Sequence, residues 1–349
     1  MKLLLLTAIS ACSSATTTSN VSNVSSSSWT EIKPGAPTIC SKGADFSFYY
    51  RKGTVNKLVV EFQGGGACWD STTCSLGTFT KTCSPPGETG VHSSTDARNP
   101  FENWNHLFVP YCTADAHGGN KTTSYKGFFS TNKIHHMGRV NSFAAMDHAF
   151  GLPENAKPDV VATIGCSAGS LGAIINAPYV NAQYPNAIHQ YFGDSYVGVI
   201  SSQQFADGVK NWDLSFSPSV PGLDHANLVR VAANKSIDAG LFIVNATITA
   251  SPDTQFASYT SSADVVQSSF YTLGGGIDWV NHMRHLTETV HDLHGSQYST
   301  FIAPGDAHCR TQDDGVYNVV SDDIKLGDWM TAFAEGKITN RKVDCKPKC

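Results

Sequence analysis

Short runs of apolar and β-branched residues recur along the chain at wide intervals. Several of these runs, such as Leu107–Pro110 and Leu241–Val244, are continuously apolar, which is typical of strands buried on both faces of a parallel sheet. The predicted strands are Phe46–Tyr50, Leu58–Phe62, Leu107–Pro110, Val160–Ile164, His189–Phe192, Leu241–Val244 and Ser299–Ala303.

Longer segments between these runs have the composition of helices. The predicted helices are Val140–Phe150, Ala168–Ala182, Trp279–Leu293 and Lys325–Glu335. Strands that alternate with helices predict an α/β fold, in which helices flank a mostly parallel central sheet.

The first residues have the pattern of an export signal. Met1 and Lys2 precede the apolar run Leu3–Leu6, and small residues follow as far as Ala15, as expected of a short apolar centre before a cleavage region. We expect residues 1–15 to be a signal peptide. Cys12 leaves an alternative open, because it also matches the cysteine of a bacterial lipoprotein.

The remainder of the chain is predicted to form a leader followed by one domain. Residues 16–29 are rich in Ser, Thr, Asn and Val and have no charge, which predicts a disordered leader. The 349 residues would allow two or three domains of about 150 residues each. No internal repeat or second linker of this composition follows, so we predict a single domain over residues 30–349.

Composition and charge exclude several classes of protein. Hydrophobic residues make up 41% of the chain, charged residues only 15%, and the formal net charge is −5. A charge of this size and sign does not favour nucleic acid or an anionic membrane as a partner. No apolar run approaches the roughly 18 residues of a membrane span, and we expect none.

The cysteines predict disulfide bonds, given the export signal. Of the ten cysteines, nine remain beyond Cys12, so one must stay unpaired or bond elsewhere. There is no CxxC pair, and we therefore expect no metal site. Asn-X-Ser/Thr sequons support export through a glycosylating pathway, and they lie at Asn20, Asn23, Asn120, Asn234 and Asn245.

One serine stands in a catalytic motif. Gly165-Cys166-Ser167-Ala168-Gly169 directly follows the predicted strand Val160–Ile164 and precedes a predicted helix. This matches GxSxG, the nucleophile elbow, in which a sharp strand-to-helix turn holds the serine above the sheet. Small residues two positions before and after the serine are required because the turn brings the two backbones together. We expect Ser167 to be a nucleophile.

A serine nucleophile needs a base, and in α/β-hydrolases the base is a histidine late in the chain. His308 follows the predicted strand Ser299–Ala303 through a turn-rich loop, so it would lie at the carboxyl edge of the sheet, where such sites form. We expect His308 to be the base. The other histidines of this part of the chain, interpreted as surface or packing residues, are His225, His282, His285, His291 and His294.

The acid that orients the base should also follow a strand. Asp253 lies in the loop after the predicted strand Leu241–Val244, and it is our first candidate. Asp194, after the strand His189–Phe192, is the second. Asp306 is only two residues from His308, which makes contact between the two side chains awkward.

A glycine-rich loop can supply the oxyanion hole. Gly64, Gly65 and Gly66 come directly after the predicted strand Leu58–Phe62, as in the HGGG-type loops of lipases and esterases. A P-loop is disfavoured because the lysine of GxxxxGK[ST] is missing. We expect amide donors from this loop and from Ala168, the residue after the nucleophile.

Taken together, these segments resemble the pectin acetylesterase and Notum carboxylesterase family. The matching segments are Gly64–Cys68, Trp104–Asp115, Gly165–Gly169, Asp253 with Gln255, and His308 with Cys309. The resemblance implies an α/β-hydrolase fold, a Ser167–Asp253–His308 triad, an oxyanion hole from Gly65, Gly66 and Ala168, and the disulfides Cys68–Cys74 and Cys40–Cys112. Trp69 either lines the acyl pocket or has a structural role.

The resemblance also implies a function. We expect a secreted, extracellular serine esterase, without a cofactor and monomeric, that removes acetyl groups from a cell-wall polysaccharide such as pectin through an acyl-enzyme. One alternative is a carboxylesterase that acts on longer acyl chains or on lipid esters. A second alternative, from another class, is a catalytically silent glycan-binding protein that has kept the scaffold.

Overall fold

The computed structural model describes residues 29–126, 131–216, 220–338, 341–347 and 349. The predicted signal peptide, residues 1–15, and residues 16–28 of the predicted leader lie outside this part. No helix of the described residues is both long and apolar enough to cross a membrane.

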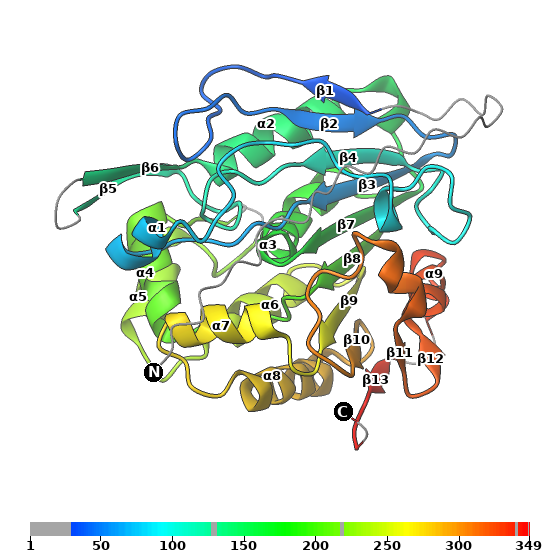
Figure 1. The fold of residues 1–349 in the computed structure, drawn as a ribbon. Helices are drawn as coiled ribbons and strands as arrows, with labels where there is room; N and C mark the ends of the chain where they lie inside the picture. Colours follow the sequence, from blue (N-terminus) through cyan, green and yellow to red (C-terminus); the bar gives the residue numbers. More distant parts are fainter. Residues whose placement is uncertain (1–28, 127–130, 217–219, 339–340, 348) are drawn as a thin grey trace, which may run out of the picture.

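A large mixed sheet runs through the centre of the structure (Figure 1). Its strands are β1 (Thr30–Ile32), β2 (Phe48–Arg51), β3 (Lys57–Phe62), β4 (Asn105–Val109), β7 (Val160–Cys166), β8 (Ile188–Asp194), β9 (Thr254–Ser261), β10 (Tyr298–Ala303) and β13 (Lys342–Asp344). They lie in the order β1-β2-β4-β3-β7-β8-β9-β10-β13. β1 and β2 are antiparallel to their neighbours, and every pair from β4 to β13 is parallel.

Two small antiparallel pairs stand apart from this sheet. They are β5 (Lys121–Lys126) with β6 (Thr131–His136), and β11 (Val320–Ser321) with β12 (Ile324–Lys325).

Helices cover both faces of the sheet (Figure 1). They are α1 (Ser71–Leu76), α2 (Gly138–Phe150), α3 (Ala168–Gln183), α4 (Ser202–Trp212), α5 (His225–Ala233), α6 (Ala239–Thr249), α7 (Val265–Leu273), α8 (Trp279–His294) and α9 (Leu326–Ala334). Short 3-10 turns are η1 (Gly90–His92), η2 (Pro153–Asn155) and η3 (Asp314–Asn318).

The hydrophobic core has two parts, because successive strand residues point to opposite faces of a sheet. In β3, Leu58, Val60 and Phe62 belong to the larger part, which includes side chains of α2, α3, α6 and α8. Val59 belongs to the smaller part, where Trp329 of α9 packs. The expected α/β architecture, with a mostly parallel sheet between helices, is confirmed.

One predicted strand is wrong. Leu241–Val244 lies within helix α6, and the side chain of Asp238 caps this helix by accepting a hydrogen bond from the Leu241 amide at 3.0 Å. A four-residue apolar run does not distinguish a strand from a buried helix. The strand between β8 and β10 is instead β9, which contains Thr, Gln and Ser as well as Phe, Ala and Tyr.

Candidate active site

Ser167 stands at the turn between β7 and α3, as the motif predicts. Its φ of 56° lies in the left-handed region, a strained conformation that the surrounding structure must hold. A Cβ on Gly165 would collide with the carbonyl oxygen of Gly169, and a Cβ on Gly169 with that of Phe62. The close approach of strand, helix and neighbouring strand therefore explains both glycines of the motif.

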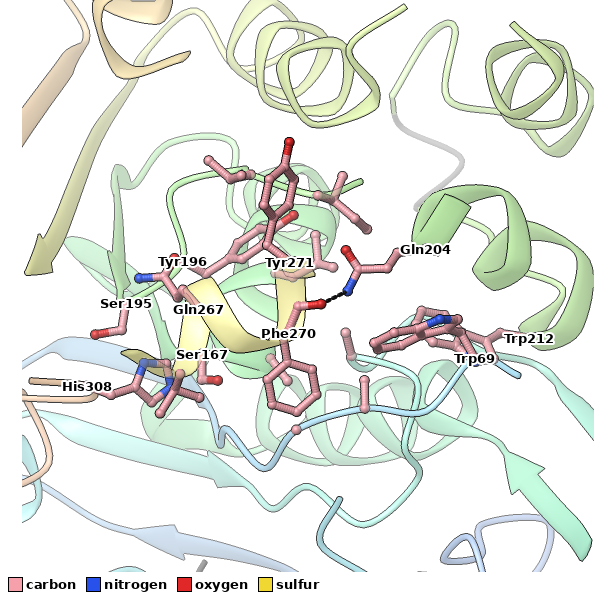
Figure 2. Close-up of a pocket in the computed structure, with 18 residues that line it drawn as sticks. Trp69, Ser167, Ser195, Tyr196, Gln204, Trp212, Gln267, Phe270, Tyr271 and His308 are labelled. Atoms are coloured by element: carbon pink, nitrogen blue, oxygen red, sulfur yellow. Dashed lines mark hydrogen bonds between the residues drawn. The ribbon is translucent and has the colours of Figure 1, made fainter. Parts of the chain in front are cut away.

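His308 lies in the loop that follows β10, and its partner is Asp264. The Nδ1 atom of His308 lies 2.8 Å from Oδ2 and 3.0 Å from Oδ1 of Asp264. Asp264 is completely buried and caps α7, where its Oδ1 accepts hydrogen bonds from the amides of Val266 and Gln267. Because Nδ1 is bound to Asp264, Nε2 is the ring nitrogen of His308 that can interact with a group in the pocket. Ser167 and His308 both line that pocket (Figure 2).

The prediction that Asp253 orients the base does not agree with this geometry. Asp253 is exposed and directly precedes β9, so it lies at the amino end of the strand, whereas His308 follows the carboxyl end of the parallel strand β10. The misplaced strand at Leu241–Val244 caused the error. Asp264 satisfies the same rule, because it comes three residues after the end of β9.

Asp194, the second candidate, holds the loop of His308 rather than its ring. Asp194 is completely buried at the end of β8, and its Oδ2 accepts hydrogen bonds from the amide and the hydroxyl of Thr311 at 2.7 and 2.6 Å. Ser195 donates to Oδ1 of Asp194 and accepts from the amide of Cys309. Burial raises the pKa of Asp194, although these hydrogen bonds oppose the shift.

A disulfide joins the two predicted catalytic segments. Cys166, which precedes Ser167, is bonded to Cys309, which follows His308. A ring nitrogen of His308 lies within 4.8 Å of both sulfur atoms. The disulfide therefore keeps the nucleophile turn and the histidine loop together, although 143 positions separate the two cysteines in sequence. This pair was not among the disulfides predicted from the sequence.

The other cysteines are arranged as follows. The structure contains Cys40–Cys112 and Cys68–Cys74, the two disulfides that the family resemblance implies, and also Cys345–Cys349. Cys83 is a free, half-buried thiol whose sulfur lies 3.6 Å from that of Cys40. Within the described residues, each group of His, Cys and acidic side chains close enough to hold a metal contains both cysteines of one disulfide, so Cys83 is the one thiol left among these groups.

The predicted oxyanion loop lies beside the nucleophile. A Cβ on Gly64 would lie 3.0 Å from the Cβ of Ser167, which shows how closely the loop passes. Gly66 has a φ of 75°, a conformation that favours glycine. Gly66 and Ala168 line the pocket, and Gly65 is fixed through its carbonyl oxygen, which accepts from the amide of Thr80 at 2.8 Å.

The rest of the pocket is mainly apolar. Figure 2 shows it extending from Ser167 and His308 past Phe270 to Trp69 and Trp212. Further apolar walls come from Leu171, Val199, Ile200 and Val266. Of the other histidines considered above, His225, His282, His285, His291 and His294 lie outside the described lining of this pocket.

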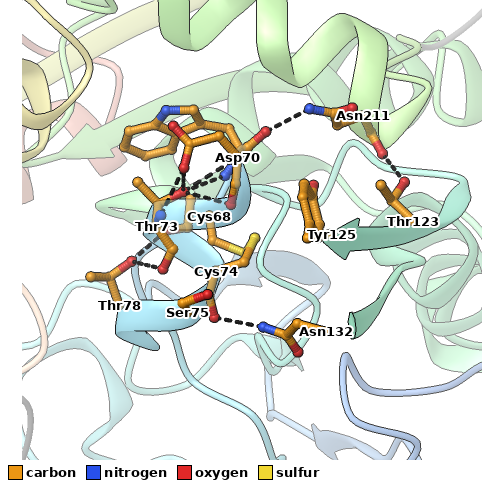
Figure 3. Close-up of a disulfide and its surroundings, with 12 residues drawn as sticks. Cys68, Asp70, Thr73, Cys74, Ser75, Thr78, Thr123, Tyr125, Asn132 and Asn211 are labelled. Atoms are coloured by element: carbon orange, nitrogen blue, oxygen red, sulfur yellow. Dashed lines mark hydrogen bonds between the residues drawn. A yellow bond between two sulfur atoms is a disulfide. The ribbon is translucent and has the colours of Figure 1, made fainter. Parts of the chain in front are cut away.

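Trp69 lines this pocket. It belongs to the segment between Cys68 and Cys74, whose disulfide and surrounding hydrogen bonds are shown in Figure 3. Its amide donates to the hydroxyl of Thr73 at 3.0 Å, and its carbonyl oxygen accepts from Asn211 at 2.7 Å. Asp70 caps α1, and the Cys68–Cys74 disulfide closes the same turn. These contacts fix the backbone of Trp69, and its side chain is buried.

The strand order, the serine at the strand-to-helix turn and the acid–histidine pair beyond neighbouring strands define an α/β-hydrolase. A family model described as Pectinacetylesterase matches residues 21–211, more than half of the chain. The chain belongs to this family. The match includes Ser167 and the glycine loop and ends before Asp264 and His308.

Curated relatives agree with this assignment. The chain is 30% identical to pectin acetylesterase 11 of Arabidopsis thaliana over 159 residues, and 25% identical to pectin acetylesterase 4 of the same plant over 209 residues. These alignments cover 42% and 57% of the chain, but only 39% and 48% of the two relatives. The chain thus spans less than half of their length.

The fold is also that of the Wnt deacylase Notum from Drosophila. One crystal form superposes with a TM-score of 0.69 at 17% identity, covering 91% of this chain and 96% of that one. A second crystal form gives a TM-score of 0.67. At this identity the similarity shows a shared fold, and it supports the expected α/β-hydrolase architecture.

Proposed function

We propose that this protein is a secreted serine carboxylesterase that removes acetyl groups from a cell-wall polysaccharide such as pectin. The observation that carries the proposal is the meeting of Ser167, on its strained turn, with the Asp264–His308 pair in one pocket. The relatives named pectin acetylesterase support acetyl esters as substrates. The four disulfides among the described residues support an oxidising, extracellular location.

In the proposed mechanism, Nε2 of His308 takes the proton of Ser167 as the hydroxyl attacks the ester carbonyl. Asp264 accepts the Nδ1–H hydrogen bond, which fixes the tautomer and stabilises the imidazolium. The amides of Gly65, Gly66 and Ala168 would bind the oxyanion of the tetrahedral intermediate. The alcohol leaves with the proton from His308, and water then hydrolyses the acyl-enzyme by the same route.

The direct test replaces the nucleophile. Ser167→Ala should abolish hydrolysis of p-nitrophenyl acetate while the circular dichroism spectrum and melting temperature stay those of the wild type. Ser296→Ala, at an exposed serine outside the pocket, is the matched control and should keep full activity. Turnover retained by Ser167→Ala would refute the assignment. Acetate release from a panel of acetylated polysaccharides then tests the substrate.

A longer acyl group is the second candidate, because the apolar part of the pocket extends well beyond what an acetyl group touches. Trp69 and Trp212 lie on the far side of the pocket from Ser167, with Phe270 between them and the serine (Figure 2). Comparison of kcat/KM for acetyl and octanoyl p-nitrophenyl esters separates the two candidates. A preference for acetyl favours the polysaccharide deacetylase, and a preference for octanoyl favours a deacylase of longer chains.

A further inference from the structure

A second, more polar cavity adjoins the catalytic pocket. Its lining includes Asp70, Ser202, Gln203, Lys235, Asp238 and His282. The two cavities share three wall residues, Trp69, Ile200 and Tyr271. These side chains therefore separate the apolar pocket, which begins at Ser167, from the space beyond it.

Tyr271 differs from the other two wall residues because a chain of hydrogen bonds holds its ring from behind. Its hydroxyl lies 2.8 Å from Nδ1 of His282, and Nε2 of His282 lies 2.5 Å from Oδ2 of Asp238. The rings of Tyr271 and His282 also meet edge to face at 5.4 Å. Asp238 is itself fixed, since its other oxygen caps α6 through the Leu241 amide.

These hydrogen bonds connect three helices at one point. Tyr271 belongs to α7, the helix that Asp264 caps, while His282 belongs to α8 and Asp238 precedes α6. A tyrosine without such partners could swing its ring aside when a long ligand presses against it. Here rotation of the ring would break a hydrogen bond to a histidine that is half-buried and already bound to a carboxylate.

We infer that Tyr271 is the residue that sets the acyl-chain length, by closing the apolar pocket against the second cavity. His282 and Asp238 are positioning residues that hold the ring in the closed orientation. The inference rests on the proposed function, because the ligand in the apolar pocket is taken to be the acyl group of the ester. It holds for either acyl candidate, since it concerns where the pocket ends.

The test compares a long with a short ester within each enzyme sample. The measured quantity is the ratio of kcat/KM for p-nitrophenyl dodecanoate to kcat/KM for p-nitrophenyl acetate. This ratio does not depend on the fraction of folded enzyme, so partial unfolding of a variant does not distort it. Tyr271→Ala should raise the ratio about tenfold or more, because access to one further methylene group is worth about that much.

Two further variants test the hydrogen-bonded chain. Tyr271→Phe keeps the ring and removes its hydrogen bond, and His282→Ala removes the partner and keeps the tyrosine. Both should raise the ratio, by less than Tyr271→Ala does. Thr272→Ala is the matched control, because Thr272 is the exposed neighbour on α7 and lies outside the described lining of both cavities. Its ratio should equal that of the wild type.

The outcomes separate this inference from the proposed function. A ratio for Tyr271→Ala within about twofold of that for Thr272→Ala overturns the inference. An increase in Tyr271→Ala with unchanged ratios in Tyr271→Phe and His282→Ala overturns the role given to His282 and Asp238. Hydrolysis of these esters by Ser167→Ala would instead refute the proposed function, whatever the Tyr271 variants show.

Discussion

Two carboxylate–imidazole groups built on the same sheet have very different surroundings. At the carboxyl edge, Asp264 is bound to His308, whose side chain is 17% exposed and faces a pocket. In the sheet interior, Glu61 of β3 is bound to His92 and His106, each at 2.8 Å, and all three side chains are at most 5% exposed. The shortest nitrogen–oxygen distance is the same in both groups.

The two groups differ in whether an imidazole remains accessible to a ligand. Each oxygen of Glu61 is occupied by a histidine. Burial opposes ionisation of Glu61, but the charge and hydrogen bonds of His92 and His106 outweigh it and lower the pKa of Glu61 to about 2. Burial lowers the pKa of His106 to about 4. An acid–imidazole pair is therefore not evidence of catalysis by itself. The pair of His308 differs because its ring lines a pocket that also contains a serine.

The largest effect should come from breaking the pair at the edge. Asp264→Asn should lower kcat for p-nitrophenyl acetate by about 10³ to 10⁴-fold, because the carboxamide no longer holds the required histidine tautomer. Folding should persist, since asparagine also caps helices well. Asp253→Asn is the control and should stay within about twofold of the wild type. Loss of activity in the Asp253 variant instead would reverse the assignment of the acid.

Breaking the interior group should affect stability rather than chemistry. Glu61→Gln leaves two buried histidines without their shared carboxylate, and we expect a loss of about 3 to 5 kcal/mol in the free energy of unfolding. Urea denaturation measures this loss, and Glu335→Gln, at an exposed site, should change it by less than about 0.5 kcal/mol. The folded Glu61 variant should keep its kcat, and a fall in kcat comparable to that of Asp264→Asn would contradict the distinction.

The covalent link at the edge provides a third, smaller comparison. The double variant Cys166→Ser with Cys309→Ser should cost about 2 to 4 kcal/mol of unfolding free energy. It should also lower kcat, because the loop of His308 would then be held by hydrogen bonds without a covalent link, among them those of Asp194, Ser195 and Asp264. Cys345→Ser with Cys349→Ser, which opens a loop far shorter in sequence, is the control and should leave kcat unchanged. An unchanged kcat in the first variant would show that the hydrogen bonds suffice.

The smallest effect concerns pH. The pKa of His106 is about 4 in the folded protein and about 6.5 when unfolded, so only the unfolded chain gains this proton as the pH falls through that window. Stability should therefore decrease with acidification, for His106 by on the order of 2 kcal/mol between pH 6.5 and pH 5. Glu61 acts in the same direction at lower pH, since its pKa of about 2 lies below the unfolded value.

Urea denaturation at several pH values, for the wild type and for His106→Gln, checks this expectation. The wild type should lose more stability than the variant on acidification. Parallel curves for the two proteins would show that His106 does not titrate as its burial implies.

The sequence allowed the nucleophile turn and the histidine to be predicted, but not the acid that binds the histidine. The nucleophile turn could be predicted because its glycines avoid steric clashes within a motif of only a few residues. Asp264 could not be predicted while Leu241–Val244 was taken for the strand that precedes the acid. The strand that does precede it, β9, was not recognised as buried because it contains many polar residues. Thr, Phe and Tyr favour strands, but the sequence does not show that neighbouring strands bury Thr254–Ser261 within the central sheet.

The Cys166–Cys309 disulfide could have been predicted from the sequence. Each cysteine stands directly beside a residue already chosen for catalysis. A nucleophile and a base that must meet bring their neighbours together as well, so this adjacency was a usable signal. The chain Tyr271–His282–Asp238 offered no such signal, because it depends on how three helices lie against one another.

The same disulfide turns residues 166–309 into a covalent ring. Helices α4 to α8 all lie on this ring, between the serine and the histidine. A protease that cuts any surface loop among them would leave both fragments joined through this disulfide. The proposed nucleophile and the proposed base would then remain covalently linked after the cut.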